Sequence, residues 1–130
     1  MSLMYPVTGP VGANVPNVTE TVVATISGVT LPRAGMPVAI TYAGTLLTGA
    51  STTAVTVRCR RGVDATGTLV GTAETPTEAA AVPVDLAGAY VDQPGELANA
   101  SYVITVQQTA ATAAGTSQAA VAIALVGTPN

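Results

Sequence analysis

Short runs of β-branched residues, separated by glycine and proline, are the feature of this sequence that most restricts its fold. Seven such runs follow one another at regular spacing, at 18–26, 37–47, 53–61, 68–73, 80–86, 100–109 and 118–126. Evenly spaced short strands with turn residues between them are typical of sandwiches, barrels and jelly rolls. We therefore expect an all-β protein, an antiparallel jelly-roll-like sandwich that spans residues 18–130.

Apolar residues alternate along these runs, which predicts strands with two distinct faces. Val55, Val57 and Cys59 fall on one face of the third run, and Val121, Ile123 and Leu125 fall on one face of the last. Successive side chains of a strand point to opposite sides of the sheet. The opposite faces often carry alanine or threonine instead of charge, and small residues let another protein surface approach closely. This pattern predicts a subunit interface on the outside of a sheet.

Residues 1–17 contain Pro6, Pro10 and Pro16 and are predicted to be an extended N-terminal arm, separate from the sandwich. Proline disfavours helices and central strands because it lacks a backbone N–H group. We expect the arm to lie on a neighbouring subunit, with Met4, Tyr5, Pro6 and Val7 in contact with the partner. A loose tail without a role is the alternative interpretation.

Thr109 to Ala122 is rich in alanine, the best helix former, but Gly115 and several threonines interrupt it and no helical stripe appears. We therefore expect a flexible hairpin loop there.

The 130-residue length fits one domain, and its composition excludes several classes of function. The chain has no histidine and no lysine, only 8% charged residues and a net charge of −3. Four arginines cannot form the clustered basic face that nucleic acid requires. A surface with so few charges favours association with other protein subunits. The N-terminus lacks the pattern of a signal peptide, and no apolar run reaches the ~18 residues that span a membrane, so we expect no membrane contact.

Catalytic and metal-binding constellations are scarce. A nucleophilic triad usually needs a histidine base, and one cysteine without histidine makes a zinc site improbable. Cys59 is expected to be a buried structural thiol. Asp85, Asp92 and Glu96 are close in sequence, which leaves open whether they bind an ion such as calcium or form a solvated loop. We therefore expect a protein that is not an enzyme and that has no cofactor.

Arg58, Arg60 and Arg61 form the one concentrated charge feature. Two interpretations remain open. Charged residues at a strand edge deter aggregation. Arginine also suits bidentate salt bridges to carboxylates of a partner, and on this interpretation the three residues are predicted to bind a partner subunit.

Three segments resemble small β-rich proteins of tailed-phage virions, which include jelly-roll capsid decoration (cement) proteins and the heads of tail fibres. They are TAVTVRCRRG at 53–62, GTLVG at 67–71 and SYVITVQQT at 101–109, and the likeness extends over most of residues 18–126. The resemblance implies a location in the virion, assembled in the host cytoplasm, and a homotrimer. It also implies the major capsid protein or other virion subunits as partners.

The favoured hypothesis is thus a capsid decoration protein that binds and stabilises the assembled shell as an oligomer. The alternative is a tail-fibre or receptor-binding head module. The scarcity of aromatic residues counts against the alternative, because binding hot spots favour tryptophan, tyrosine and arginine.

Overall fold

The computed structural model describes residues 3–16, 19–31, 37–47, 52–75, 83–94, 97–110 and 116–127. Within these ranges the chain forms eight β-strands. They are β1 (Leu3–Pro16), β2 (Thr21–Leu31), β3 (Val38–Leu47), β4 (Thr52–Arg61), β5 (Thr68–Thr75), β6 (Pro83–Asp92), β7 (Leu97–Ala110) and β8 (Thr116–Gly127). Seven of the strands overlap the seven runs of β-branched residues, and the remaining one, β1, precedes them.

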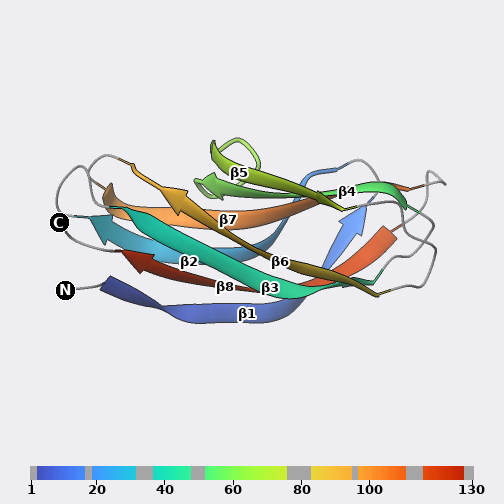
Figure 1. Ribbon diagram of the computed structural model, residues 1–130, viewed down its shortest axis with the longest axis horizontal. Helices are drawn as coiled ribbons and strands as arrows, with labels where there is room; N and C mark the ends of the chain where they lie inside the picture. Colours follow the sequence, from blue (N-terminus) through green and yellow to red (C-terminus); the bar gives the residue numbers. More distant parts are fainter. Residues whose placement is uncertain are drawn as a thin grey trace.

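The strands form two four-stranded antiparallel sheets that pack face to face (Figure 1). The first sheet has the order β1-β8-β3-β6, and the second has the order β2-β7-β4-β5. The chain crosses from one sheet to the other at almost every connection, which is the strand arrangement of a jelly roll. The prediction of an all-β, jelly-roll-like sandwich is confirmed.

β1 is an edge strand of the first sheet and pairs with β8 along its length, from Leu3 opposite Gly127 to Pro16 opposite Thr116. The sequence analysis separated residues 1–17 from the sandwich as an arm, and the structure differs for the part that it describes. The pairing is irregular between Tyr5 and Thr8 and again between Thr8 and Val11. Pro6 and Pro10 fall within these two irregular stretches. Proline is tolerated at such places in an edge strand, because its missing N–H group is not needed for pairing there.

The core lies between the two sheets, where the larger apolar side chains of each strand point inward. Buried residues of the first sheet include Val15, Val38, Ile40, Leu46, Leu86, Val121, Ile123 and Leu125, and those of the second include Ile26, Val29, Val55, Val57, Cys59, Tyr102, Ile104 and Val106. The alternation predicted for the third and last runs is therefore observed. Val103 and Thr105 on the opposite face of β7 are also buried, so this central strand is covered on both sides.

The alanine-rich segment that was expected to be a loop is largely strand. β7 continues to Ala110 and β8 begins at Thr116, while residues 111–115 lie outside the described residues. Long antiparallel pairing with β4, β1 and β3 outweighs the poor strand propensity of alanine here. No helix long and apolar enough to cross a membrane is found in the ranges that the structure describes.

Candidate interaction surface

The outer face of the first sheet is built from small residues. The side chains that point away from the core on β3, β6 and β8 are exposed or partly exposed. We name this surface the alanine face, and it consists of Ala39, Thr41, Ala43, Thr45, Ala87, Ala89, Val91, Ala122, Ala124 and Val126. The alternating pattern predicts a subunit interface at this position, and the contact stays a prediction.

The strand register aligns these residues in rows across the sheet. Thr41 lies opposite Ala89 of β6 on one side and opposite Ala124 of β8 on the other. Ala43 likewise lies between Ala87 and Ala122 in the next row. Because directly opposite residues share one side of the sheet, each of these rows presents only small side chains.

Larger residues occur in the row at one end of the face. There Ala39 lies between Val91 and Val126, and the side chain of Val91 is 68% exposed. Asp85, which lies opposite Thr45 towards the other end, is the charged residue among the described outward positions of these three strands.

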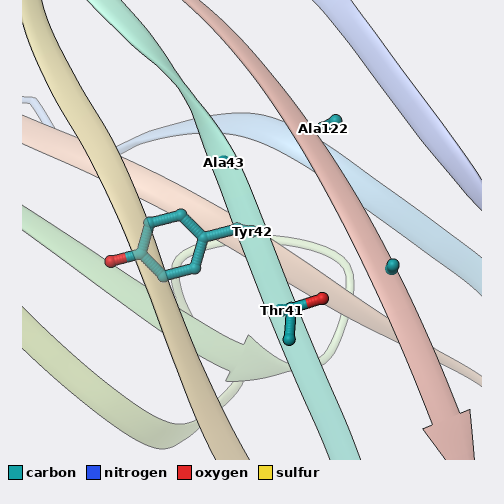
Figure 2. Close-up of a pocket in the computed structure, with 5 residues that line it drawn as sticks. Thr41, Tyr42, Ala43 and Ala122 are labelled. Atoms are coloured by element: carbon teal, nitrogen blue, oxygen red, sulfur yellow. The ribbon is translucent and has the colours of Figure 1, made fainter.

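The middle rows enclose a shallow depression of about 150 Å³. It is lined by Thr41, Tyr42, Ala43, Ala122 and Ala124, from β3 and β8, and the ring of Tyr42 turns away from Ala122 towards β6 (Figure 2). Sites for small molecules usually occupy about 300–1,000 Å³ and contain several converging polar groups. The depression is smaller and offers one threonine hydroxyl, so its shape suits the packing of a protein surface better than the binding of a ligand.

The outer face of the second sheet carries charge instead, and Glu20, Arg58 and Arg60 are paired there within the chain. Glu20 accepts a bidentate interaction from Arg60, with Nε at 2.7 Å from Oε2 and Nη2 at 3.0 Å from Oε1. Arg58 Nη1 lies 3.3 Å from Glu20 Oε1 and donates to Gln107 Oε1 at 2.7 Å, and the Thr105 hydroxyl donates to Glu20 Oε2 at 2.7 Å. This network covers β7 and accounts for the burial of Thr105.

The network shifts the acidity of Glu20. The hydrogen bond from Arg60 lowers the pKa of the Glu20 carboxyl below its usual value of 4.5. Partial burial opposes this effect, and the bond from Thr105 together with the charges of both arginines adds to it. Glu20 is therefore ionised at neutral pH.

Arg61 forms a second internal ion pair, at one end of the sandwich. Its Nη1 atom lies 2.7 Å from Oδ2 of Asp92, and the hydroxyl of Tyr102 donates to the same oxygen at 2.7 Å. Asp92 belongs to the first sheet and the other two residues belong to the second, so the cluster ties the sheets together. Burial, reinforced by the bond to Asp92, raises the pKa of Tyr102.

All three arginines predicted to bind a partner thus have carboxylate partners in their own chain. Their contact with another subunit stays a prediction. Arg58 and Arg60 share Glu20, and Arg61 pairs with Asp92, so two carboxylates offset part of the charge of the three arginines. β4 lies between β7 and β5, so the three residues are not at a strand edge.

The other predicted partner residues lie near the start of β1. Met4 lies opposite Val126 and Tyr5 opposite Leu125, while Pro6 and Val7 fall in the irregular stretch that follows. The register thus brings Met4 to the row of Val91, Ala39 and Val126. Their contact with a partner also stays a prediction.

The candidate chemical groups do not converge on a common site. Cys59 is fully buried, and burial, with the charge of Asp92 as a smaller cause, raises the pKa of its thiol to about 12. Asp85 points to the outside of β6, while Asp92 on the same strand binds Arg61 and Tyr102. Glu96 lies outside the described residues, among which no group of three or more potential metal ligands is found.

Sequence reasoning missed Glu20, and it considered Asp92 only as an ion ligand and not as an acceptor of this polar framework. It also missed the buried Gln108, whose Nε2 atom donates to the carbonyl oxygen of Val15 at 2.6 Å. Hydrogen-bond partners this far apart in the sequence cannot be recognised from a local sequence pattern. The only available indication is the rarity of acidic residues, seven in the chain, beside four arginines that need counter-charges.

Comparison with known proteins supports the fold. No protein-family model matches the chain, and no curated protein matches its sequence. The chain is similar to a structure of infectious bursal disease virus, Gx strain, with a TM-score of 0.60 and 12% identity over 97% of this chain and 32% of the other. A structure of the Gt strain gives a TM-score of 0.59 at 11% identity, over 96% and 33%. The chain thus spans about a third of these viral chains. A structure of Bacillus endospore appendages covers 100% of this chain and 92% of the other at 18% identity, with a TM-score of 0.41.

Proposed function

We propose that this chain is a non-enzymatic structural protein of a virus particle, a capsid decoration protein that binds and stabilises the assembled shell as an oligomer. The alanine face is the observation that carries the proposal. It is a broad, exposed and nearly uncharged sheet surface, which is typical of a protein contact and not of a site for chemistry.

The fold and the sequence resemblance point in the same direction. Jelly rolls recur in viral capsid proteins, and the viral structures similar to this chain share its fold at a TM-score near 0.6. The segments at 53–62, 67–71 and 101–109 resemble small β-rich proteins of tailed-phage virions, which include decoration proteins and the heads of tail fibres. The Cys59 thiol is buried, and Asp92 and Glu20 accept hydrogen bonds within the chain. These internal contacts support a structural role over catalysis.

The proposed mechanism is thermodynamic linkage. A protein that binds the assembled shell, and not the free capsid subunits, lowers the free energy of the assembled state. At a free concentration 100 times its Kd, such a ligand contributes about 2.7 kcal/mol per site. Many copies on one shell add up, so that the particle resists heat and internal pressure.

The decisive measurement is the number of copies in purified particles, obtained by quantitative mass spectrometry against the major capsid protein. We expect hundreds of copies per particle. A handful would contradict decoration and favour the tail-fibre or receptor-binding head, and absence from the particles would contradict both.

A second experiment tests the stabilising role. Particles produced without this protein should release their genome at a lower temperature than complete particles. Purified protein added back should raise the release temperature to that of complete particles. An equal release temperature for both kinds of particle would show that the protein does not stabilise the shell.

A further inference from the structure

We propose that β1 is exchanged between copies of this chain, so that in the oligomer the place beside β8 is filled by β1 of another copy. The inference deepens the proposed function, from which it takes only the oligomer, and it names the segment that joins the copies. The occupant follows from the structure, because a strand with this sequence is already seated in that place.

The place beside β8 has to be filled. β1 pairs with β8 along its length, and Val15 of β1 is fully buried there. The Val15 carbonyl oxygen accepts the amide of Gln108 at 2.6 Å, and Gln108 is itself only 1% exposed. Without β1 the core beneath Val15 would be open, and a buried amide would lose an acceptor, which destabilises the fold. β1 of another copy supplies the same side chain and the same carbonyl oxygen.

β1 can change chains while the rest of both sheets stays paired. It is an edge strand whose sheet neighbour is β8, so β8, β3 and β6 remain one sheet without it (Figure 1). Its register is interrupted on both sides of Thr8, and fewer ladder hydrogen bonds hold an interrupted strand. No residue of Leu3–Pro16 is charged, so a detached β1 gains by pairing with another β8 instead of remaining in water.

The connection between β1 and β2 is short. Four residues, 17–20, follow Pro16 before β2 begins, and the last of them, Glu20, is held on the outer face of the second sheet by Arg58 and Arg60. Packed sheets lie ~10 Å apart, and four extended residues reach ~14 Å at most. The closed arrangement thus has little slack. Short hinges favour exchange, because an exchanged strand does not have to return to its own chain.

Exchange requires no new complementary surface, because the contacts of β1 within one chain recur between two chains. A short tether holds β1 near its own β8 at an effective concentration in the millimolar range. Neighbouring copies compete at similar concentrations, in a concentrated solution or in an ordered array. In the exchanged form, another subunit is contacted by the four residues predicted to bind a partner at the start of β1, Met4, Tyr5, Pro6 and Val7.

A disulfide between β1 and β8 shows which chain supplies β1. Met4→Cys and Val126→Cys, combined with Cys59→Ala, place two thiols at directly opposite positions, where the Cα separation of antiparallel strands suits a disulfide. The variant is refolded in reductant and then oxidised. On a non-reducing gel, we expect links between chains, with a share at least roughly tenfold higher after refolding at about 1 mM than at about 10 μM. Links within single chains only, at both concentrations, would overturn the proposal.

A second pair of cysteines serves as the matched control. Thr41→Cys and Ala89→Cys, also with Cys59→Ala, occupy opposite and exposed positions of β3 and β6, which are not exchanged. Their disulfide should form within single chains at both concentrations. An equal share of links between chains in the two variants would indicate collision of folded molecules and would overturn the assignment to β1.

A longer connection tests the role of the hinge. Insertion of Gly-Ser-Gly-Ser after Asn17 in the Met4 and Val126 variant should lower the share of links between chains at least roughly threefold, because β1 then reaches its own β8 more easily. The same insertion after Gln93, an exposed residue between β6 and β7, should leave the share unchanged. Equal shares for both insertions would overturn the role of the short connection. None of these measurements uses a virus particle, so their failure is distinct from failure of the decoration hypothesis.

Discussion

At the scale of single residues, Glu20 stabilises the outer face of the second sheet. It joins the segment before β2 to Arg58 and Arg60 of β4 and to Thr105 of β7. A hydrogen bond to a charged group contributes about 1.5–3 kcal/mol when it is shielded from water, and less when water competes. The carboxylate is partly buried, so its removal takes one acceptor from Arg58, one from Arg60 and the acceptor of the buried Thr105 hydroxyl.

Replacement of Glu20 by glutamine should therefore lower the free energy of unfolding by about 1–3 kcal/mol, as measured by urea denaturation. Asp85→Asn removes one negative charge from an exposed position and serves as the control, with an expected change within about 0.5 kcal/mol. Equal effects of the two substitutions would show that the network adds no stability beyond net charge.

The thiol of Cys59 should be unreactive in the folded protein. Thiolate is the reactive form, and burial raises the pKa of this group to about 12. A chromogenic disulfide reagent at about pH 8, where an ordinary thiol is partly ionised, should label Cys59 only as fast as the protein unfolds. The same reagent in concentrated urea provides the control. Rapid labelling without denaturant would contradict the packing of β4 against the first sheet.

At the scale of elements, β1 belongs to the sandwich. Its Val15 is fully buried, and the Val15 carbonyl oxygen accepts the amide of Gln108 from the opposite sheet. The prolines of β1 argued against a strand, because the sequence does not show that β1 lies at the edge of a sheet with β8 on one side only. The remaining strands could be predicted from local pattern, since each has its own run of β-branched residues between turns.

Deletion of residues 1–16 should therefore prevent cooperative folding, whereas a separate arm could be removed without loss of structure. The deletion would expose the edge of β8 and the core beneath Val15. We expect loss of the thermal transition in circular dichroism, together with aggregation. The point variant Val15→Asp should reproduce the defect, and Thr45→Asp, at an exposed position of β3, should not. A deletion variant that keeps its thermal transition and does not aggregate would contradict the assignment of β1.

β5 and β6 lie at the edges of different sheets, and they contact each other where the ring of Tyr90 packs against Gly71. The ring of Tyr90 stacks on that of Tyr42, with centroids 5.9 Å apart and planes at 20°, and it packs directly against Gly71 of β5. A methyl group at position 71 would overlap the ring. Overpacking of this kind costs about 1–3 kcal/mol, because neighbouring side chains leave their preferred rotamers.

Gly71→Ala should accordingly destabilise the protein by about 1–3 kcal/mol in urea denaturation. In the background of Tyr90→Leu, the same substitution should cost clearly less, because the ring that it displaces is absent. An equal cost in both backgrounds would place the effect in the backbone of β5 instead of in the ring contact.

At the scale of the whole molecule, stability should fall in acid. The folded pKa of Glu20 lies below its unfolded value near 4.5, so the unfolded chain takes up the proton more readily. The stabilising contribution of Glu20 is complete above the unfolded pKa and is lost as the pH falls through the folded pKa. The free energy of unfolding should thus decline below about pH 5, and the decline should be smaller in Glu20→Gln. An identical pH profile for both proteins would contradict the shift.

Much of the fold could be predicted from the sequence, but little of the network of ion pairs and hydrogen bonds could. Alternation along Val55–Cys59 and Val121–Leu125 indicated which faces are buried, and the alanines between the latter indicated an uncharged outer surface. The pairing of Arg61 with Asp92, and of both other arginines with Glu20, depends on sheet order, which no local pattern records. The internal ion pairs of the three arginines could therefore not be predicted, and their contact with a partner subunit stays a prediction.

The position of β8 has a consequence for how this molecule acquires its structure. β8 lies between β1 and β3, so Leu3 must find Gly127 before the first sheet is continuous. Sheets assembled from such distant segments fold slowly, typically in milliseconds to seconds. A ribosome-bound chain that lacks β8 holds β1 and β3 without the strand between them. The edges of β1 and β3 that face β8 therefore stay unpaired until β8 has been synthesised and inserts between them.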